Sequence, residues 1–116
     1  MSKPYTALVI PADRELPCYH TVIESFRDLQ GKVGGTFDMV VANVVDDDFN
    51  PVNIDIWVND EGLIWQMPQN QRAEWLAGKH LVGDAVVSGE PTAEGESTSV
   101  PDFLLARLDL MNAINS

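Results

Sequence analysis

The sequence predicts an α+β fold: a small mixed or antiparallel sheet of about five short strands, an N-terminal amphipathic helix, a short helix and an apolar C-terminal helix. Residues 54–58 alternate between the two sides, as the residues of a half-buried strand do. Residues 19–30 instead place apolar side chains at helical spacing. Both patterns occur within 116 residues, which is the size of one domain.

The N-terminal part of the chain predicts a strand followed by a helix. Residues 5–10 form the strand, and Pro11 ends it because proline lacks an amide donor and fixes its own φ. Residues 19–30 form the amphipathic helix, because charged residues separate the apolar ones. The apolar residues are Val22, Ile23, Phe26 and Leu29. Gly31 is then expected to cap this helix in a left-handed conformation.

The middle of the chain predicts the other four strands and a short helix. The strands are residues 37–44, 54–58, 63–65 and 81–87. The second and third of these form a hairpin around the turn at residues 59–62. A helix of two turns or fewer occupies residues 72–77, and Gly78 ends it.

The composition divides the chain into three segments. Residues 1–89 form the α+β domain, and residues 90–99, made only of Ser, Gly, Glu, Pro, Thr and Ala, predict a flexible linker. Residues 100–116 contain a helix that Pro101 starts. Apolar residues cover more than one stripe of this helix, so we expect it to pack on the domain or on a second subunit. The contacts expected in such a homodimer are Phe103, Leu104, Leu108 and Met111.

The chain is strongly acidic, with seven Lys and Arg against eighteen Asp and Glu and a net charge of -11. Such a surface repels the phosphate backbone, so direct binding of nucleic acid is not expected. The charge agrees with a solubilising role. Carboxylates also pair with the Lys and Arg that normally hold phosphates, so mimicry of DNA is a second interpretation.

The sequence predicts a cytoplasmic protein without a membrane partner. The N-terminus lacks the basic region and the long apolar run of a signal peptide. No apolar stretch approaches the roughly 18 residues of a membrane span. Cys18 is the single cysteine and cannot form an internal disulfide, which agrees with a reducing compartment.

No motif in the chain indicates catalysis, a metal or a cofactor. Residues 46–50 match part of a calcium loop, but Pro51 stands where glycine is needed. Cys18 and His20 lack the partners of a zinc site or of an activated nucleophile. The glycine-rich run 31–35 leads from helix to strand, whereas a phosphate loop leads from strand to helix. We therefore expect a protein that is not an enzyme.

Three groups of residues are candidates for binding. The first is the acidic loop Asp46, Asp47 and Asp48. The second is the pair of hairpin tryptophans, Trp57 and Trp65, which form a hot spot for a partner protein if both are exposed. The third is a set that surrounds a nucleotide-like anion, namely Gly34, Gly35, Asn70 and Arg72.

Four ordered motifs also resemble a known family. They are Leu29-Gln30 with Val33-Gly34-Gly35, Val58 to Leu63, Pro68 to Ala73, and Leu81 to Val87. Over residues 5–89 the chain resembles a family of small proteins of unknown function from actinobacterial phages and mobile elements. The resemblance implies a phage context and an α+β fold, and it brings no catalytic residues.

The phage context and the lack of a catalytic set lead to three hypotheses. The leading one is a non-enzymatic phage accessory protein that binds and blocks a host protein, in a host-interaction or counter-defence role. The second is sequestration of a small nucleotide signal. The third is an acidic DNA mimic that inhibits a DNA-binding protein. Enzymatic action is the least favoured, because it requires a titratable group with a perturbed pKa in a cleft.

Overall fold

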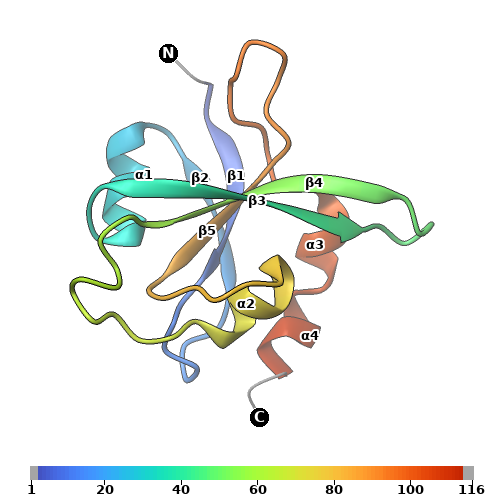
Figure 1. Cartoon of the computed structure of the whole chain (residues 1–116). Helices are drawn as coiled ribbons and strands as arrows, with labels where there is room; N and C mark the ends of the chain where they lie inside the picture. The colour runs from blue at the N-terminus through green and yellow to red at the C-terminus, as the bar shows by residue number, and fades with distance from the viewer. Residues whose placement is uncertain (1–2, 114–116) are drawn as a thin grey trace.

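A five-stranded sheet organises residues 3–113, the part of the chain that this computed structural model describes (Figure 1). The strands are β1 (Tyr5–Ile10), β2 (Tyr19–Ile23), β3 (Phe37–Val45), β4 (Pro51–Asn59) and β5 (Ala85–Gly89). The helices are α1 (Phe26–Val33), α2 (Gln71–Ala77), α3 (Asp102–Ala106) and α4 (Leu108–Ala113). The strand order is β2-β1-β5-β4-β3, and neighbouring strands are antiparallel. The predicted α+β class is therefore confirmed.

Strand β5 lies at the centre of the sheet, and all five of its residues are buried. Val87 stands opposite Leu8 of β1 on one side and opposite Ile56 of β4 on the other. A strand that is paired on both edges and covered on both faces has apolar residues at nearly every position, because both of its faces are buried. This explains the run of small and branched apolar residues at 85–87.

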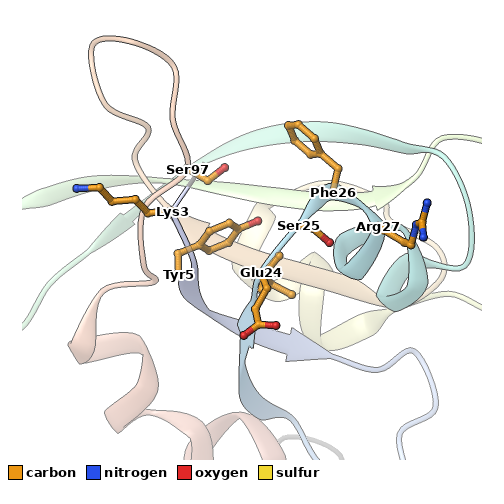
Figure 2. A pocket seen from close by; sticks show the side chains of 8 residues that line it. Lys3, Tyr5, Glu24, Ser25, Phe26, Arg27 and Ser97 are labelled. Carbon is orange, nitrogen blue, oxygen red and sulfur yellow. The ribbon is translucent and has the colours of Figure 1, made fainter. Parts of the chain in front are cut away.

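One face of the sheet packs against α1. The buried residues on this face are Tyr5, Ala7, Val9, Ile23, Leu29, Val33 and Val86. Ser25 starts the helix, because its hydroxyl accepts a hydrogen bond from the Asp28 amide at 3.2 Å. At the open end of this layer, Tyr5 of β1 and Phe26 of α1 line the same cavity (Figure 2).

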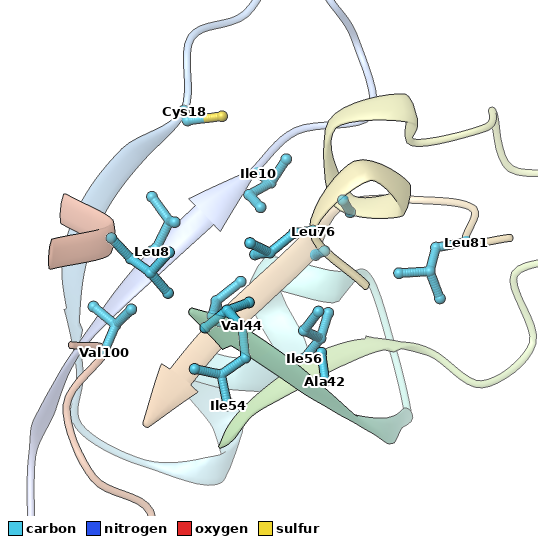
Figure 3. Packing of buried hydrophobic residues seen from close by; sticks show 14 of the residues in the cluster. Leu8, Ile10, Cys18, Ala42, Val44, Ile54, Ile56, Leu76, Leu81 and Val100 are labelled. Atoms are coloured by element: carbon cyan, nitrogen blue, oxygen red, sulfur yellow. The ribbon is translucent and has the colours of Figure 1, made fainter. Parts of the chain in front are cut away.

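The opposite face carries the larger core, which α2 and the C-terminal segment cover (Figure 3). Its residues include Leu8, Ile10, Ala42, Val44, Ile54, Ile56, Leu76, Leu81, Val87, Val100 and Leu104. Leu104 of α3 is only 1% exposed. The amide of Val100 donates a hydrogen bond to the Thr6 carbonyl at 2.9 Å. The C-terminal segment is therefore packed within the core of the same chain.

Asn70 anchors the start of α2 with both ends of its side-chain amide. The oxygen accepts a hydrogen bond from the Ala73 amide at 3.0 Å, which caps the helix. The nitrogen donates to the carbonyls of Ile10 at 2.8 Å and Gly83 at 2.9 Å. One side chain thus joins α2 to the end of β1 and to the turn before β5.

Arg72 is a buried cation that binds backbone carbonyls and has no ion-pair partner among the described residues. Its Nη2 donates to the carbonyls of Pro11 at 2.8 Å, Asp13 at 3.1 Å and Leu16 at 2.7 Å. Its Nη1 donates to the Asn112 side chain in α4 at 3.2 Å. Arg72 therefore ties α2 to the β1–β2 loop and to the C-terminal helix.

The predicted helix at residues 19–30 is wrong in its first half. Residues 19–23 form strand β2, which pairs with β1 from Tyr5↔Ile23 to Val9↔Tyr19. The helix begins only at Phe26 and continues through Gly31 to Val33, and Gly34 caps it with a φ of 82°. The branched residues Val22 and Ile23 satisfied the helical spacing by chance, and strand pairing decided their conformation.

Three other element predictions also require correction. Residues 63–65 form turns instead of a strand, and the last strand begins at Ala85 instead of Leu81. The single helix predicted after Pro101 is divided into α3 and α4 at Arg107. No helix within residues 3–113 is long and apolar enough to span a membrane.

The segment predicted as a linker, residues 90–99, folds back between β5 and β1. The Thr92 and Gly95 amides close it with hydrogen bonds to Glu96 and Thr92 carbonyls, both at 2.9 Å. The Gly89 amide donates to the Thr98 carbonyl at 3.0 Å. A Cβ atom on Gly89 would stand 2.3 Å from the Ser99 carbonyl oxygen, so only glycine permits this close approach.

Replacing Arg72 with methionine should destabilise the fold by about 3 kcal/mol, because three carbonyls lose their donor while the apolar stem is kept. Urea unfolding followed by circular dichroism measures the change. The matched control is Arg14→Met, at an exposed position, which should stay within about 0.5 kcal/mol of the wild type. Equal stability of the two variants would contradict the role assigned to Arg72.

Asp55 is a buried carboxyl group that is 3% exposed on the α1 side of β4. Burial raises its pKa, and the nearby carboxylate of Glu90 raises it further. A raised pKa in the folded state means that folding disfavours the charged form. The cost is absent below the unfolded pKa of roughly 3.9 and is complete above the folded pKa.

Replacing Asp55 with asparagine should therefore stabilise the protein at neutral pH by about 1 kcal/mol. The difference from the wild type should grow as the pH rises through the raised pKa, and thermal unfolding at several pH values measures it. Asp48→Asn in an exposed turn is the control and should show a smaller pH dependence. A less stable Asp55→Asn protein at neutral pH would show that the carboxylate makes a required interaction.

Candidate functional site

The acidic loop joins β3 to β4, and two of its carboxylates hold the loop itself together. Asp46 accepts hydrogen bonds from the amides of Asp48 and Asn50, both at 2.9 Å. Asp47 forms an ion pair with Arg107 at 2.9 Å, and Arg107 also donates to the Val45 carbonyl at 3.1 Å. Asp46 therefore orders the loop and Asp47 pairs with the C-terminal segment, and Asp47 and Asp48 are both exposed.

Trp57 and Trp65, the two tryptophans of the predicted hairpin, do not form one exposed pair. Trp57 is half-buried, and its indole nitrogen donates to the Ser88 hydroxyl at 3.0 Å. Its ring packs edge-on against Phe37, with centroids 5.2 Å apart. Trp65 is 68% exposed. Of the pair, only Trp65 presents its ring fully to a partner.

The four residues predicted to surround an anion serve the fold instead. Asn70 and Arg72 are each 1% exposed, and backbone carbonyls occupy their donors. The Arg72 Nε lacks a partner but is itself buried. Gly34 and Gly35 end α1, and both of their amides donate to the Gln30 carbonyl. The two side chains of this predicted anion site are buried, and the site remains a prediction.

The apolar residues predicted as dimer contacts lie in the C-terminal segment. Leu104 is buried in the main core, and Phe103 and Leu108 are half-buried against it. The side chain of Met111 lies outside the part of the chain that the structure describes. These contacts are made within one chain, and the homodimer remains a prediction.

The cysteine and histidines do not form a reactive cluster. Burial raises the pKa of the Cys18 thiol, and the nearby Arg72 guanidinium offsets part of this. Its backbone amide is also fixed by the Asn112 side chain at 2.7 Å. Within residues 3–113, no three His, Cys, Asp or Glu side chains come together in a way that could hold a metal ion. A buried, protonated thiol is a poor nucleophile.

His80 makes one polar contact that shapes its surroundings. Its Nδ1 lies 2.6 Å from the Glu74 carboxylate. Hydrogen bonds from the Gln69 side chain and the Leu81 amide lower the pKa of Glu74, with a smaller effect from His80. Glu74 therefore stays ionised and fixes the turn that follows α2.

Three large apolar residues in succession, Leu63, Ile64 and Trp65, are exposed, and we call them the apolar loop. These side chains are 72%, 74% and 68% exposed. Single exposed apolar residues are common on protein surfaces, but three large ones in succession are uncommon. The apolar loop therefore marks a candidate contact surface.

The apolar loop is held by a succession of backbone turns after β4. The Trp65 amide donates to the Glu61 carbonyl at 3.0 Å, and the Met67 amide donates to the Gly62 carbonyl at 2.9 Å. Asn59 supports the entry, because its side-chain oxygen accepts from the Glu61 amide at 2.7 Å. The exposed side chains are thus presented on a hydrogen-bonded support.

Two glycines allow Met67 to pack under this loop. A Cβ atom on Gly83 would lie 2.9 Å from the Met67 sulfur, and one on Gly62 would lie 2.8 Å from a methyl group of Val82. Gly83 also has a φ of 78°, which side chains rarely adopt. Glycine is therefore required at both positions for the observed packing.

A groove continues from the apolar loop toward the outer strand β3. It has a volume of about 370 Å³. Its apolar surface comes from Val40, Val58, Leu63, Ile64, Leu81 and Val82. Lys79, His80, Asp38 and Asp60 provide polar groups around it. The loop and the groove together form one apolar surface with charged edges.

The sequence contained a signal for this loop that the strand prediction did not use. Leu63-Ile64-Trp65 has no polar alternation, and Gly62 and Pro68 stand close on either side. Gly and Pro so close to a three-residue apolar run favour a loop over a paired strand. What remained invisible in the sequence was that all three side chains point into solvent.

Comparison with known proteins gives one match in sequence and one in fold. No curated protein sequence matches the chain. The fold resembles part of the protein in the "Crystal structure of small RNA methyltransferase HEN1", with a TM-score of 0.58 and 12% sequence identity over 77% of this chain. The match covers only 13% of that methyltransferase chain. At this identity the likeness concerns the fold alone.

The sequence match is to a family and is much more extensive. Residues 5–112 match the family described as a domain of unknown function, DUF3846. The match includes residues 90–112, which the resemblance over residues 5–89 left out. It agrees with the packing of Val100 and Leu104 in the core. Because the match covers nearly the whole chain, the protein belongs to the DUF3846 family of domains of unknown function.

Proposed function

We propose that this protein is a non-enzymatic binding domain that occupies a partner protein through the apolar loop and the adjoining groove. The observation that carries the proposal is the exposure of Leu63, Ile64 and Trp65 on a hydrogen-bonded turn. Tryptophan is among the residues most enriched at the energetic centres of protein interfaces. Burying a large apolar side chain contributes about 1.5–3 kcal/mol, so three of them supply a substantial part of a binding energy.

The support under the loop favours recognition of a partner with little loss of flexibility. A loop that is already ordered before binding pays a smaller entropic cost than one that orders on contact. The backbone turns of residues 61–67 and the packing of Met67 against Gly83 provide this order. The apolar loop is therefore ordered before it meets a partner, and the groove supplies further apolar surface beside it.

The charge of the chain favours a partner with a basic rim. The net charge of -11 attracts basic surfaces over a distance of about 8–10 Å at physiological salt. Asp38 and Asp60 lie at the edge of the groove, where they could pair with Lys or Arg of the partner. Such pairs mainly increase association rate and specificity. The expected partner therefore has an apolar cleft with cations at its edge.

The phage context implied by the sequence resemblance supplies the biological interpretation. In this proposal the partner is a host protein in the bacterial cytoplasm, and the effect is blocking by occupancy. This is a host-interaction or counter-defence role, and it needs no catalytic residue. DNA mimicry by this loop is less favoured, because the Asp46 carboxylate accepts two amides of the loop itself.

The test compares proteins that co-purify with the tagged wild type and with a variant carrying Leu63→Ser, Ile64→Ser and Trp65→Ser, both expressed in a bacterial host. We expect one protein at a fixed ratio with the wild type and at least a tenfold loss with the variant, which lacks the apolar anchors. Quantitative mass spectrometry measures the ratio. Circular dichroism establishes that the variant is folded.

Trp75→Ala is the matched control, because Trp75 is also exposed, at 55%, but lies on α2 and not on the apolar loop. It should retain the partner. Equal retention by the triple variant would contradict the proposal, and so would a wild type that carries no protein at a fixed ratio. Loss of the partner on replacing Asp46, Asp47 and Asp48 alone would move the contact to the acidic loop.

A further inference from the structure

A separate cavity lies on the α1 side of the sheet, between the start of β1, the β2–α1 corner and the 90–99 segment (Figure 2). Its volume is about 500 Å³. Side chains that matter for its chemistry are Lys3, Tyr5, Ile23, Phe26, Arg27 and Ser97. Pockets that hold small organic ligands have volumes of roughly 300–1,000 Å³, so this one has the size of a ligand site.

An aromatic row supports one wall of the cavity. Phe26 is 66% exposed, and its ring centroid lies 6.1 Å from that of Phe37. Phe37 packs edge-on against Trp57, whose indole nitrogen is bonded to Ser88. The exposed Phe26 ring therefore contacts Phe37, and Trp57 in turn holds the Phe37 ring in place. A planar ligand finds a stacking surface on Phe26 that requires little reordering.

Tyr5 provides a polar group facing this wall. Its side chain is mostly buried, and its hydroxyl points into the space between Ser97 and Phe26 (Figure 2). Burial raises the pKa of Tyr5, a hydrogen bond with Ser97 lowers it, and the Asp55 carboxylate raises it again. The hydroxyl is therefore neutral at physiological pH and available as a donor or acceptor to a ring substituent.

Two cationic side chains line the cavity of this acidic protein. Lys3 and Arg27 extend at opposite sides of it (Figure 2). They are two of the seven Lys and Arg in a chain with a net charge of -11. Glu24 also lines the cavity, and its backbone amide donates a hydrogen bond to the Asp28 carboxylate at 2.9 Å. Because Asp55 acts on Tyr5 from within the sheet, an anionic group is expected near Arg27 instead.

The start of α1 adds to this charge distribution. Ser25, the residue that caps the helix, lines the cavity, so the positive end of the helix dipole opens there. The cavity, the Phe26 ring and Arg27 thus meet at the start of α1. The combination suits a ligand with a flat ring and an anionic group.

We propose that this cavity binds a mononucleotide, with the base stacked on Phe26 opposite Tyr5 and the phosphate held by Arg27 at the start of α1. Arginine is suited to phosphate because its planar group donates two parallel hydrogen bonds. The site is distinct from the apolar loop and uses none of the residues of the groove beside it. It gives the protein a second binding activity that is independent of the proposed protein partner.

The test is titration calorimetry of the full chain with AMP, GMP, CMP and UMP, with adenosine and inorganic phosphate as separate probes. We expect at least one mononucleotide to bind, and the matching nucleoside and phosphate each to bind at least tenfold more weakly. Phe26→Ala and Arg27→Gln should each weaken binding about tenfold, through lost stacking and a lost charged hydrogen bond. Both side chains are exposed, so both variants should fold.

Arg14→Gln is the charge-matched control, because Arg14 is exposed in the β1–β2 loop, away from the cavity. It should bind nucleotide as the wild type does, and so should Trp65→Ala, which separates this site from the apolar loop. Failure of all four nucleotides to bind at millimolar concentration would overturn the proposal. An equal loss in Arg14→Gln and Arg27→Gln would also overturn it, because the effect would then be general electrostatics.

Discussion

The attachment of α2 by two buried polar side chains is the constraint on which the rest of the structure depends. Arg72 satisfies three carbonyls of the β1–β2 loop, and Asn70 satisfies one at the end of β1 and one before β5. A buried cation is expensive unless its donors are satisfied. Here carbonyl dipoles supply most of the compensation, so the loop must keep the shape that directs those carbonyls inward. The helix and the loop therefore fix each other.

This attachment also fixes the base of the apolar loop. Residues 68–70 run beside residues 81–83, with hydrogen bonds from Asn70 to the Leu81 carbonyl at 2.9 Å and from Gly83 to the Pro68 carbonyl at 2.8 Å. Met67 enters the protein just before this pairing, and its sulfur packs on Gly83. The exposed side chains at 63–65 stand on this support. A surface feature thus depends on polar groups that lie inside the molecule.

The sequence predicted well those strands that have a clear local pattern of apolar and polar residues. Strands β1, β3 and β4 were predicted to within a few residues, because each is bounded by proline, glycine or charged loops. Strand β2 was missed because an edge strand with half its side chains exposed does not differ from a helix in spacing. The signal that could have placed the helix start was Ser25 with Asp28 three residues later.

The candidate site was harder to predict, because the sequence does not show which polar residues are buried in the fold. Asn70 and Arg72 were interpreted as ligand-binding groups, but their partners are carbonyls as far as 60 and 61 residues away in the chain. Every residue has a backbone carbonyl, so residue types in the sequence do not indicate which carbonyls are the partners. The apolar loop had the reverse problem, because apolar residues are usually assigned to the interior. The first error comes from contacts between distant segments, and the second comes from apolar side chains that make few contacts within the chain.

The distribution of cations explains how an acidic chain can hold more than one specific surface. Arg72 is buried and donates to backbone carbonyls, Arg107 pairs with Asp47, and Lys32 lies 5.7 Å from the Tyr19 ring centroid. With so few cations left, positive charge near the surface is local, and the two at the cavity beside Phe26 stand out against a negative background. Long-range repulsion disfavours polyanions such as nucleic acid. A small anion that enters the cavity interacts chiefly with its near neighbours, because salt screens the distant carboxylates within about 8–10 Å. A surface charge that disfavours a nucleic acid chain is therefore compatible with the proposed site for a single nucleotide.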